Sequence, residues 1–379
     1  MALIDDLAEI AVDAGCSGFG VAGAGPFPDE RDELRRRLAD GSSAGLTFTY
    51  RDPDTATDVR RSFPWAERLV VLAHPYLPAA GAPGPPQPGT GRVARFATAD
   101  HYGPLRAALA AVADRLTAAG HRAEAVCDDA RLSDRAAAVR AGIGWRGKNT
   151  MVLAPGVGPW VLLGTVVTDA QLLVSEPTSR SCGSCSACLP ACPTGALVAP
   201  GVLDARRCLA AIAQQPGAIP RQYRKALHDR LYGCDDCLEA CPPGSRLLLS
   251  STERRGRVDL TAVLDADDAS IRADLGHWYL PKADPVTVRR NALVALGNTG
   301  GDDAVALLAK FLDHPRPVLR LHAAWALGEI GSVAACSALR SALTGERHPD
   351  VRNEIEVALT TSAAPATSGS TDGGLPSRR

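Results

Sequence analysis

The spacing of hydrophobic residues changes several times along the first 175 positions of the chain. Apolar residues recur at helical intervals in residues 2–14 and 105–119, which predicts amphipathic helices there. Apolar runs at residues 68–73 and 151–167 instead predict buried strands, and prolines and glycines break the second run into a strand pair. Shorter elements are expected at residues 18–22, 30–39, 122–127 and 134–141. This mixture predicts an α+β fold, with one α/β domain over residues 1–175.

A repeated pattern follows near the other end of the chain. VRRNALVALGNTG from Val288 is similar to LRLHAAWALGEIG from Leu319, 31 residues on, and VRNEIEVAL follows from Val351. Each copy has a proline just upstream, where a helix can begin. Helix pairs at this interval predict HEAT-like repeats over residues 251–360, whose stacked faces usually bind a macromolecule. The alternative is a helical cap over the preceding domain, and residues 361–379 have the composition of a disordered tail.

Residues 176–250, between these two regions, are rich in cysteine. The run from Cys182 to Pro193 has the spacing C-x2-C-x2-C-x3-C-P of a bacterial ferredoxin-like module, in which the fourth cysteine ligates the other of two 4Fe-4S clusters. A second run, from Cys234 to Pro242, lacks the leading cysteine, and Cys208 is the obvious replacement. The spacing therefore predicts one cluster on Cys182, Cys185, Cys188 and Cys241, and another on Cys192, Cys208, Cys234 and Cys237.

Zinc and disulfide bonds are the alternative uses of such cysteines. Zinc sites take cysteines in C-x2-C pairs, but they rarely place three at this spacing with a fourth and a proline behind them. Disulfides need an oxidising compartment, and the N-terminus shows neither a basic export region nor a twin-arginine pair. We therefore expect a cytoplasmic protein with no membrane segment, in which Cys16, Cys127 and Cys336 are buried free thiols.

The formal net charge of the chain is only -1, so its overall charge does not predict a nucleic-acid partner. Two local groups of basic residues stand out against this balance. The group around the cluster cysteines is either a phosphate-facing surface or a solvated face, and it comprises Arg206, Arg207, Arg221, Arg224, Lys225 and Arg230. A basic ridge on the repeats would comprise Arg289, Arg290, Arg316 and Arg320.

A glycine-rich loop, GIGWRGKNT, runs from Gly142 to Thr150 within the first domain. Its small residues would let the backbone approach a bulky ligand, which Trp145 or Lys148 would cover. Most glycine-rich loops only turn corners, however. This one does not have the phosphate-binding pattern G-x4-G-K-[ST], because its glycine spacing differs and Asn149 follows the lysine.

The order of these parts resembles one family, the epoxyqueuosine reductases, which are cobalamin-dependent iron-sulfur enzymes of tRNA modification. The likeness runs from the first domain through GIGWRGKNT, CGSCSACLPACPTGAL, GCDDCLEACP and HWYLPKADPVTVRRNALVALGN into the repeats. It implies an oxidoreductase that reduces the epoxide of epoxyqueuosine at the tRNA wobble position, the last step of queuosine biosynthesis. It also implies cobalamin as a cofactor, an anticodon stem-loop as substrate, an unidentified reducing partner and a monomeric protein.

The resemblance implies roles for individual residues as well. In VCDDAR from Val126, matching Ala130 to the alanine of the family's V-D-S-A-P segment places Asp128 on the catalytic aspartate, which would protonate the departing oxygen. Asp129 is the fallback, and adjacent aspartates at a strand end are otherwise often helix caps. Cobalamin is expected between the first domain and the cluster module, in contact with Asp128 and with Arg60, Trp145, Lys148, Asn149 and Thr150.

Two other classes of protein also fit part of this sequence, but each leaves some of its features unexplained. Reductive dehalogenases also combine cobalamin with two 4Fe-4S clusters, but they normally carry a twin-arginine signal and have no reason to append HEAT repeats. An iron-sulfur electron-transfer protein with a helical docking domain would not bind cobalamin, and it would leave the glycine-rich loop and the paired aspartates without a role. The family's Tyr-His pair is reversed here as His101 and Tyr102, so both line the pocket or His101 only packs.

Overall fold

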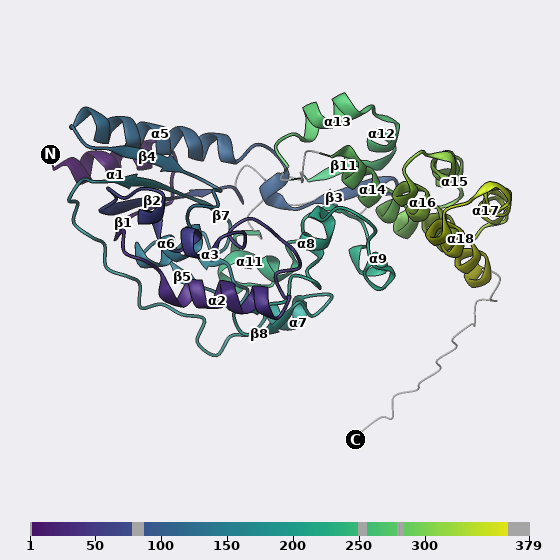
Figure 1. Ribbon diagram of the computed structural model, residues 1–379, viewed down its shortest axis with the longest axis horizontal. Coiled ribbons are helices and arrows are strands. Elements are labelled where there is room, and N and C mark those ends of the chain that lie inside the picture. The colour runs from purple at the N-terminus through teal and green to yellow at the C-terminus, as the bar shows by residue number, and fades with distance from the viewer. Residues whose placement is uncertain (1, 78–86, 249–255, 279, 281–283, 363–379) are drawn as a thin grey trace, which may run out of the picture.

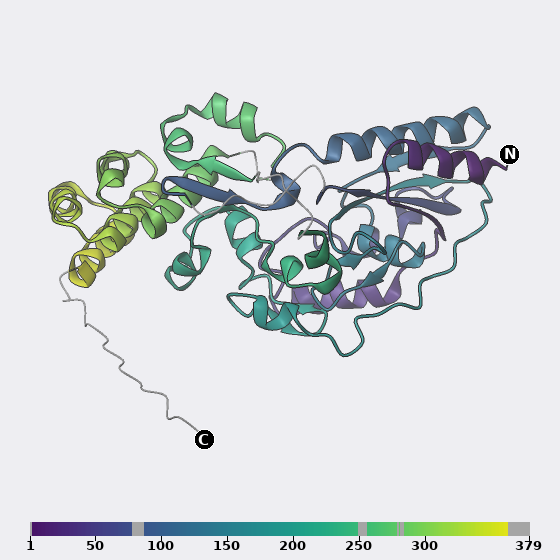
Figure 2. The same cartoon turned by 180° about the vertical axis from the view of Figure 1, so that it is seen from behind.

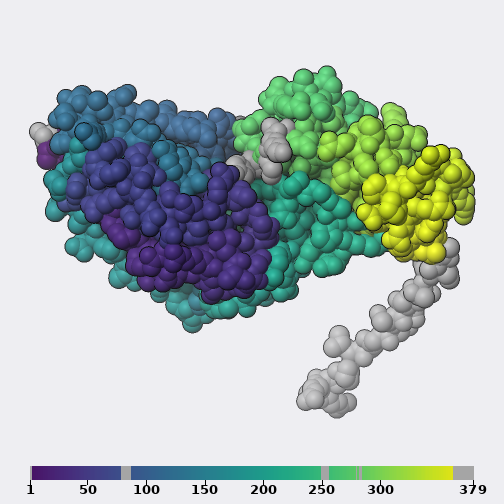
Figure 3. Space-filling view, viewed as in Figure 1, coloured from purple at the N-terminus to yellow at the C-terminus, as the bar shows by residue number. Residues whose placement is uncertain are grey.

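The computed structural model describes residues 2–77, 87–248, 256–278, 280 and 284–362. The molecule is elongated, with the first domain at one end, the repeat helices at the other and the cysteine-rich module between them (Figures 1 and 3). Within the described residues, every helix is too short or too polar to cross a membrane. Residues 363–379 of the predicted tail lie outside the described residues.

An antiparallel sheet forms the centre of the first domain. Its four strands are ordered β1 (Gly18–Gly23), β2 (Arg68–Pro75), β7 (Val161–Thr168) and β4 (Ala123–Val126). Helices α1 (Leu3–Asp13) and α5 (Tyr102–Ala118) cover one face, and α6 (Asp134–Arg140) packs on the other (Figures 1 and 2). Val70 and Leu72 of β2 face the first two helices, while the alternate residues Leu69, Val71 and Ala73 face α6. The mixed α and β prediction for this region is confirmed.

The apolar run at residues 151–167 does give two strands, but they belong to different sheets. Strand β7 lies in the main sheet, whereas β6 (Val152–Leu153) pairs with β5 (Trp145–Arg146) in a small hairpin of its own. The remaining elements of the first domain are helix α2 (Pro28–Ala39) and the short α3 (Pro53–Ala56), η1 (Val59–Arg61) and η2 (Arg95–Ala97).

A second sheet joins the three parts of the chain. Its central strand β3 (Thr90–Val93) comes from the first region and pairs in parallel with β10 (Arg230–Tyr232) of the cysteine-rich module. On its other side β3 pairs antiparallel with β11 (Arg257–Asp259), which precedes the repeats. Backbone hydrogen bonds therefore connect the three regions. The domain boundaries given from the sequence stay a prediction.

Short elements make up the cysteine-rich module and leave the cysteines on loops and helix ends. They are α7 (Cys188–Ala191), β8 (Leu197–Ala199), β9 (Val202–Leu203), α8 (Leu209–Gln214), α9 (Arg221–Leu227), α10 (Asp236–Glu239) and α11 (Pro242–Leu248). Helices α8 and α9 pack directly on the first repeat helix, so the module and the repeats share one hydrophobic core.

Each repeated motif forms one long helix that begins at its upstream proline. These inner helices are α14 (Pro285–Thr299), α16 (Pro317–Ile330) and α18 (Pro349–Ser362). They stack side by side, α14 on α16 and α16 on α18, in both views (Figures 1 and 2). The helices that lead into or connect them are α12 (Leu260–Asp265), α13 (Asp268–Leu275), α15 (Asp302–Lys310), η4 (Phe311–Asp313) and α17 (Val333–Gly345). The HEAT-repeat prediction is confirmed.

Candidate functional site

A cavity of about 1030 Å³ opens where the first domain, the cysteine-rich module and the chain before the repeats meet. Its volume is at the upper end of ordinary ligand pockets, so it has room for a large cofactor or a nucleotide. The first domain contributes residues 45–51, Phe96, Asp100, Tyr102, Arg106, Asp128 and Arg135 to its wall. The module contributes residues 214–216, and the chain before the repeats contributes residues 276–278.

Two adjacent aspartates follow strand β4 and differ in their surroundings. Asp128 lines the cavity and is accessible through it, yet the surrounding protein raises the pKa of its carboxyl by removing hydration, which Arg106 offsets only in part. Asp129 accepts hydrogen bonds of 2.7 to 3.0 Å from the guanidinium of Arg131, which lowers its pKa. The first carboxyl is therefore the better proton donor, and the second is a fixed carboxylate.

Backbone strain collects around this cavity. Asp128 has a φ of 53° and Thr150 a φ of 70°, in the left-handed region that side chains other than glycine rarely adopt. Ala44, just before the cavity-lining residues 45–51, has a φ of 56°. Such residues cost of order 1–3 kcal/mol each and persist where surrounding contacts hold them, commonly at functional sites.

Cations and aromatic rings dominate the remaining wall. The guanidinium of Arg106 lies 5.3 Å from the centre of the Tyr102 ring, and both line the cavity. Arg51 and Arg106 are exposed, and the guanidinium group of neither makes a hydrogen bond or ion pair with any residue that the structure describes. Together with Phe48 and Trp278, they suit a ligand that has both flat rings and anionic groups.

The glycine-rich loop packs between this wall and the cysteines. Lys148 Nζ donates to the carbonyl of Gly183, beside Cys182, at 2.8 Å, so the lysine does not cover the cavity. Two buried donors of the loop, Trp145 Nε1 and Asn149 Nδ2, have no acceptor among the described residues. Buried donors usually have a partner, so a bound polar group would complete this loop.

Three other residues from the predicted site lie in different settings. Thr150 is buried, and its carbonyl accepts a hydrogen bond of 3.4 Å from Arg135 of the cavity wall. Arg60 instead donates to the carbonyl of Ala66 and pairs with Glu67, away from the residues that line the cavity. His101 is buried against Tyr76, so it packs, whereas its neighbour Tyr102 lines the cavity.

The thiols of Cys182, Cys185, Cys188 and Cys241, called the Cys182 set, are electrostatic neighbours. The pKa of Cys241 is raised to about 11, mainly by burial, and the other three thiols of the set contribute to the rise. Burial also raises the pKa of Cys188, again with contributions from Cys182 and Cys185. Cys185 is exposed, so this set reaches the molecular surface.

The thiols of Cys192, Cys208, Cys234 and Cys237, called the Cys192 set, form a second group. Burial raises the pKa of Cys237, and the other three thiols of the set add to the rise. Burial also acts on Cys192, but backbone N–H donors outweigh it and lower the pKa, as from Ala196 N at 3.1 Å. Such N–H···S bonds favour a thiolate, the form that binds iron.

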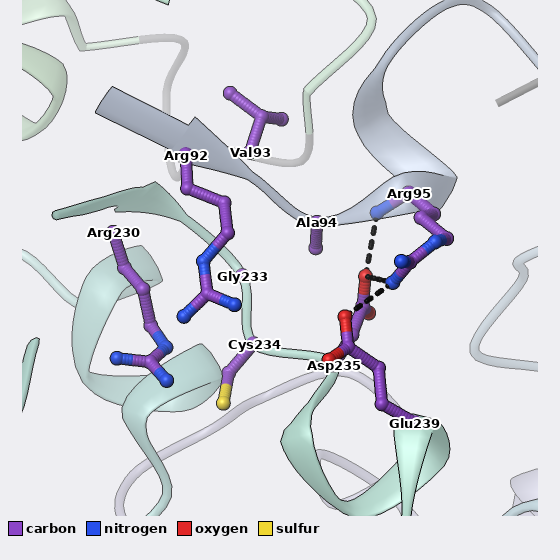
Figure 4. Close-up of a pocket in the computed structure, with 9 residues that line it drawn as sticks. All are labelled: Arg92, Val93, Ala94, Arg95, Arg230, Gly233, Cys234, Asp235 and Glu239. Carbon is purple, nitrogen blue, oxygen red and sulfur yellow. Dashed lines mark hydrogen bonds and ion pairs between the residues drawn. The ribbon is translucent and has the colours of Figure 1, made fainter. Parts of the chain in front are cut away.

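Charged side chains surround Cys234 of the Cys192 set (Figure 4). Arg92 and Arg230 lie on one side of it, and Asp235 and Glu239 on the other. Arg95 N donates to Asp235 Oδ2 at 2.8 Å, and Arg95 Nη1 pairs with Glu239 Oε1 at 2.5 Å. Because Phe96, the next residue, lines the cavity, this network joins the Cys192 set to the cavity wall.

Comparisons with known proteins agree with this arrangement. Residues 181–244 match the family model of a 4Fe-4S double cluster binding domain, and residues 277–360 match that of HEAT repeats. The epoxyqueuosine reductase of Bacillus subtilis is 33% identical over 369 residues, which cover 93% of this chain and 94% of the relative. The chain belongs to the epoxyqueuosine reductase family. It is an oxidoreductase with a 4Fe-4S cluster-binding domain and HEAT repeats.

Solved structures of the family share the fold. One holds an epoxyqueuosine reductase with an epoxyqueuosine-modified tRNA-Tyr stem loop; it is 31% identical, with a TM-score of 0.87 over 95% of this chain and 98% of that one. Another is the Bacillus subtilis enzyme with its catalytic aspartate loop swung out of the active site, 31% identical, with a TM-score of 0.86 over 94% of this chain and 98% of that one.

Most of the predicted phosphate-facing basic residues of this family member pair with carboxylates of the protein. Arg224 and Arg230 are buried and pair with Glu354, at 3.0 Å, and with Asp236. The more exposed Arg221 and Lys225 pair with Glu354 and Glu329. These contacts hold the module to the repeats or to itself. Arg206 and Arg207 remain exposed, although Arg206 pairs with Asp204.

The predicted basic ridge on the repeats is wrong for three of its four arginines. Arg290 is buried against backbone carbonyls, Arg289 pairs with Asp268, and Arg320 forms a two-pronged ion pair with Glu346. Charge along a sequence does not reveal such internal partners. Only Arg316, among these four, has a largely exposed side chain.

Several cavity residues were not anticipated from the sequence. Residues 45–51, GLTFTYR, have no helical or strand period, and the residues just before them, Ser42 and Ala44, contact residues more than 150 positions away. Asp100, Arg106 and Arg135 are charged residues in or beside helices, where a solvated face is the ordinary expectation. Residues 276–278 overlap HWYLPKADP, so the family resemblance was the one signal for them.

Proposed function

We propose that this chain reduces the epoxide of epoxyqueuosine in tRNA to the alkene of queuosine, with cobalamin and two 4Fe-4S clusters as cofactors. Membership of the family and the stem-loop complex of a relative support the reaction and the substrate. The observation that carries the proposal is Asp128, a carboxyl of raised pKa on a strained loop in the wall of the large cavity. A cytoplasmic monomer with an external electron donor completes the proposal.

The two cysteine sets have the donor chemistry that two clusters require. Each set brings four thiols. The pKa of Cys241 in the first set, and that of Cys237 in the second, is raised in part by all three other thiols of the same set. Buried thiols with raised pKa values hold their protons until a metal replaces them. We assign one cluster to the Cys182 set and the other to the Cys192 set. Bound there, the clusters would pass single electrons from a surface donor toward the cavity.

Cobalamin fits the cavity by its size. The glycine-rich loop is not among the residues that line the cavity, but two of its buried donors have no acceptor among the described residues. Trp145 and Asn149 would hold the cofactor by hydrogen bonds. Of the other predicted contacts, Thr150 adjoins Arg135 of the wall, whereas Arg60 and Lys148 are engaged elsewhere. When bound, cobalamin supplies a low-valent cobalt centre strong enough to reduce an epoxide.

Asp128 would act on the oxygen that leaves. Conversion of an epoxide to an alkene breaks two C–O bonds, consumes two electrons and two protons, and releases the oxygen as water. A protonated carboxyl beside that oxygen would donate one of these protons as the bond breaks. Its raised pKa keeps more of it protonated near neutral pH than an ordinary aspartate would be. Asp129 cannot substitute easily, because Arg131 holds it as a carboxylate.

The substrate RNA would meet the cavity through its free cations. The guanidinium groups of Arg51 and Arg106 are bound by no described carboxylate or carbonyl, so they can bind phosphates. Phe48 and Tyr50 would pack against unstacked bases of the anticodon loop, while Trp278, buried and stacked on Tyr232, supports the wall. Binding should therefore weaken as salt is raised.

The test is an anaerobic reaction of cluster-reconstituted protein with cobalamin, a strong reductant and tRNA carrying epoxyqueuosine. Mass spectrometry of the nucleosides should show the loss of one oxygen. Cys208→Ser should lower the iron content by about half and stop conversion, whereas Cys336→Ser, in the repeats, should leave both unchanged. Wild-type protein that holds both clusters and cobalamin but converts nothing would contradict the proposal. Failure to bind cobalamin at all would favour the electron-transfer alternative.

A further inference from the structure

The inner helices of the repeats present buried polar residues at one equivalent position. The fourth residue of the three repeated motifs is Asn291 in the first, His322 in the second and Glu354 in the third. Their exposed fractions are 1%, 0% and 7%. A polar residue at a buried position needs a hydrogen-bonding partner, so a repeated one indicates a surface built against a specific neighbour.

That neighbour is a single stretch of the cysteine-rich module, contacted in chain order. Asn291 Nδ2 donates to the carbonyl of Ala213 at 2.9 Å, and the backbone N–H of Ile219 donates to His322 Nε2 at 3.1 Å. Glu354 pairs with Arg224 at 3.0 Å. The face of a solenoid that usually binds another macromolecule is here occupied by residues 212–224 of its own chain.

Arg290 makes the densest contacts with this stretch. Its Nη1 donates to the carbonyls of Gln215 and Gly217 at 2.5 and 2.7 Å, and its Nη2 donates to those of Ile212 and Ala213 at 3.1 and 3.2 Å. Burial lowers its pKa to about 10, and the structure gives it no carboxylate among the described residues. Its charge is balanced by carbonyl dipoles at the C-terminal end of α8, which favour a cation.

Residues 212–219, called the wall segment, connect these contacts to the cavity. Gln214, Gln215 and Pro216 of this segment line the cavity. On the side away from the repeats, Gln215 Nε2 donates to the carbonyl of Ala44 at 2.7 Å, next to the cavity-lining residues 45–51. The wall segment is therefore held from both sides, by the repeats and by the first domain.

We infer that Arg290 is a positioning residue, and that Asn291 and His322 assist it. Together they hold the wall segment in place, so that the cavity keeps the shape that receives the substrate base of the RNA. The repeats then contribute to substrate binding from behind the wall. The expected change in KM for the tRNA rests on the proposed function, whereas the expected loosening of the wall segment rests only on the contacts of Arg290. A group that binds five acceptors through a planar fork cannot be replaced by a lysine, which offers three donors from one point.

The test compares Arg290→Lys with Arg320→Lys in the cluster-loaded full chain. Arg320 is also a repeat arginine in a two-pronged contact, but its partner is Glu346 and not the wall segment. In Arg290→Lys, hydrogen exchange of the amides in residues 212–219 should become about tenfold faster, with iron content unchanged. KM for tRNA carrying epoxyqueuosine should rise about tenfold, while kcat changes less than about threefold. Arg320→Lys should change neither exchange in the wall segment nor KM.

A second variant covers the case in which Arg290→Lys fails to fold. Gln215→Ala removes the tether to Ala44 from a part-buried position, and it should also quicken exchange in the wall segment and raise KM. Unchanged exchange in the wall segment in both variants would overturn the inference, as would a loss confined to kcat. If wild-type protein converts no substrate, the proposed function fails, and the exchange measurement alone then decides whether Arg290 holds the wall.

Discussion

Arginines gather in two regions of this molecule, the cavity wall and the contact between the repeats and the cysteine-rich module, and their partners differ. In the cavity, the guanidinium groups of Arg51 and Arg106 are exposed and have no hydrogen-bond or ion-pair partner among the residues described. At the contact between module and repeats, Arg224 and Arg290 are buried and bound to a carboxylate or to carbonyls. The difference shows that a local count of basic residues does not identify an RNA surface. What matters is whether their donors are already engaged.

The same contrast separates the two aspartates, and it gives the largest expected effect. Asp128→Asn removes the carboxyl that makes no ion pair with a described arginine and keeps a raised pKa, so conversion of epoxyqueuosine should fall by about 10²- to 10⁴-fold. Asp129→Asn, which removes the carboxyl bound by Arg131, should reduce conversion only modestly. Single-turnover conversion with both clusters loaded measures this. Equal losses of conversion in the two variants would show that Asp128 is not the specific proton donor.

The pH dependence of the wild-type reaction follows from the same carboxyl. Burial raises the pKa of Asp128, and a proton donor works only in its protonated form. Its protonated fraction decreases as pH rises through that pKa, so the single-turnover rate should be highest on the acid side and fall toward alkaline pH. Above the pKa the fall should approach about tenfold per pH unit. A rate that rises with pH would assign the essential group to a base.

The engaged arginines should affect stability and not binding. Glu354→Gln leaves the buried Arg224 without its carboxylate, which should destabilise the fold by about 3 kcal/mol. Glu356→Gln is a matched control on the same helix, because Glu356 is exposed and Arg352 is its one ion-pair partner among the described residues, and it should cost less than about 0.5 kcal/mol. Chemical unfolding followed by helical circular dichroism compares them. Equal stability of the two variants would mean that the contact between repeats and module does not depend on this pair.

A free cation of the cavity should show the reverse behaviour. Arg106→Gln removes a guanidinium that contacts the Tyr102 ring but no described carboxylate or carbonyl. Affinity for the anticodon stem-loop should fall by about tenfold at low salt, and the slope of log affinity against log salt should decrease by about one phosphate contact. Stability should change by less than about 0.5 kcal/mol. An unchanged salt slope would show that Arg106 does not meet a phosphate.

Much of this structure could be predicted because its signals are local. The helical and strand periods depend on residues within a few turns of one another, and the cysteine spacing and the repeat interval are patterns along the sequence that need no knowledge of contacts. The second sheet could not be predicted in this way, because β3 pairs with strands more than 130 residues further along the chain. The cavity wall depends on contacts of the same long-range kind, such as the one from Gln215 to Ala44, which brings residues 214–216 beside residues 45–51.

The site residues divide along the same line. Asp128 could be placed by its likeness to a family motif, but its separation from Asp129 depends on the side chain of Arg131, whose two-pronged contact is visible only in three dimensions. The interpretation of Arg290 as part of a basic ridge was wrong for a related reason. Its guanidinium donates inward to four backbone carbonyls and to the side chain of Asn291, and the carbonyls carry no signal in the local sequence.

The smallest expected effect concerns Arg316, which tests where the two regions meet. Its side chain is exposed, and its nearest carboxylate, that of Asp284, is 3.9 Å away, so Arg316→Gln should change stability by less than about 0.5 kcal/mol. Because it lies on the repeats and not in the cavity wall, stem-loop affinity should also change less than about twofold. Fluorescence anisotropy at two salt concentrations, beside Arg106→Gln, measures this. A loss of affinity as large as that of Arg106→Gln would show that the RNA also contacts the repeats. An exposed guanidinium would then be enough for RNA binding, whether or not it lies in the cavity wall.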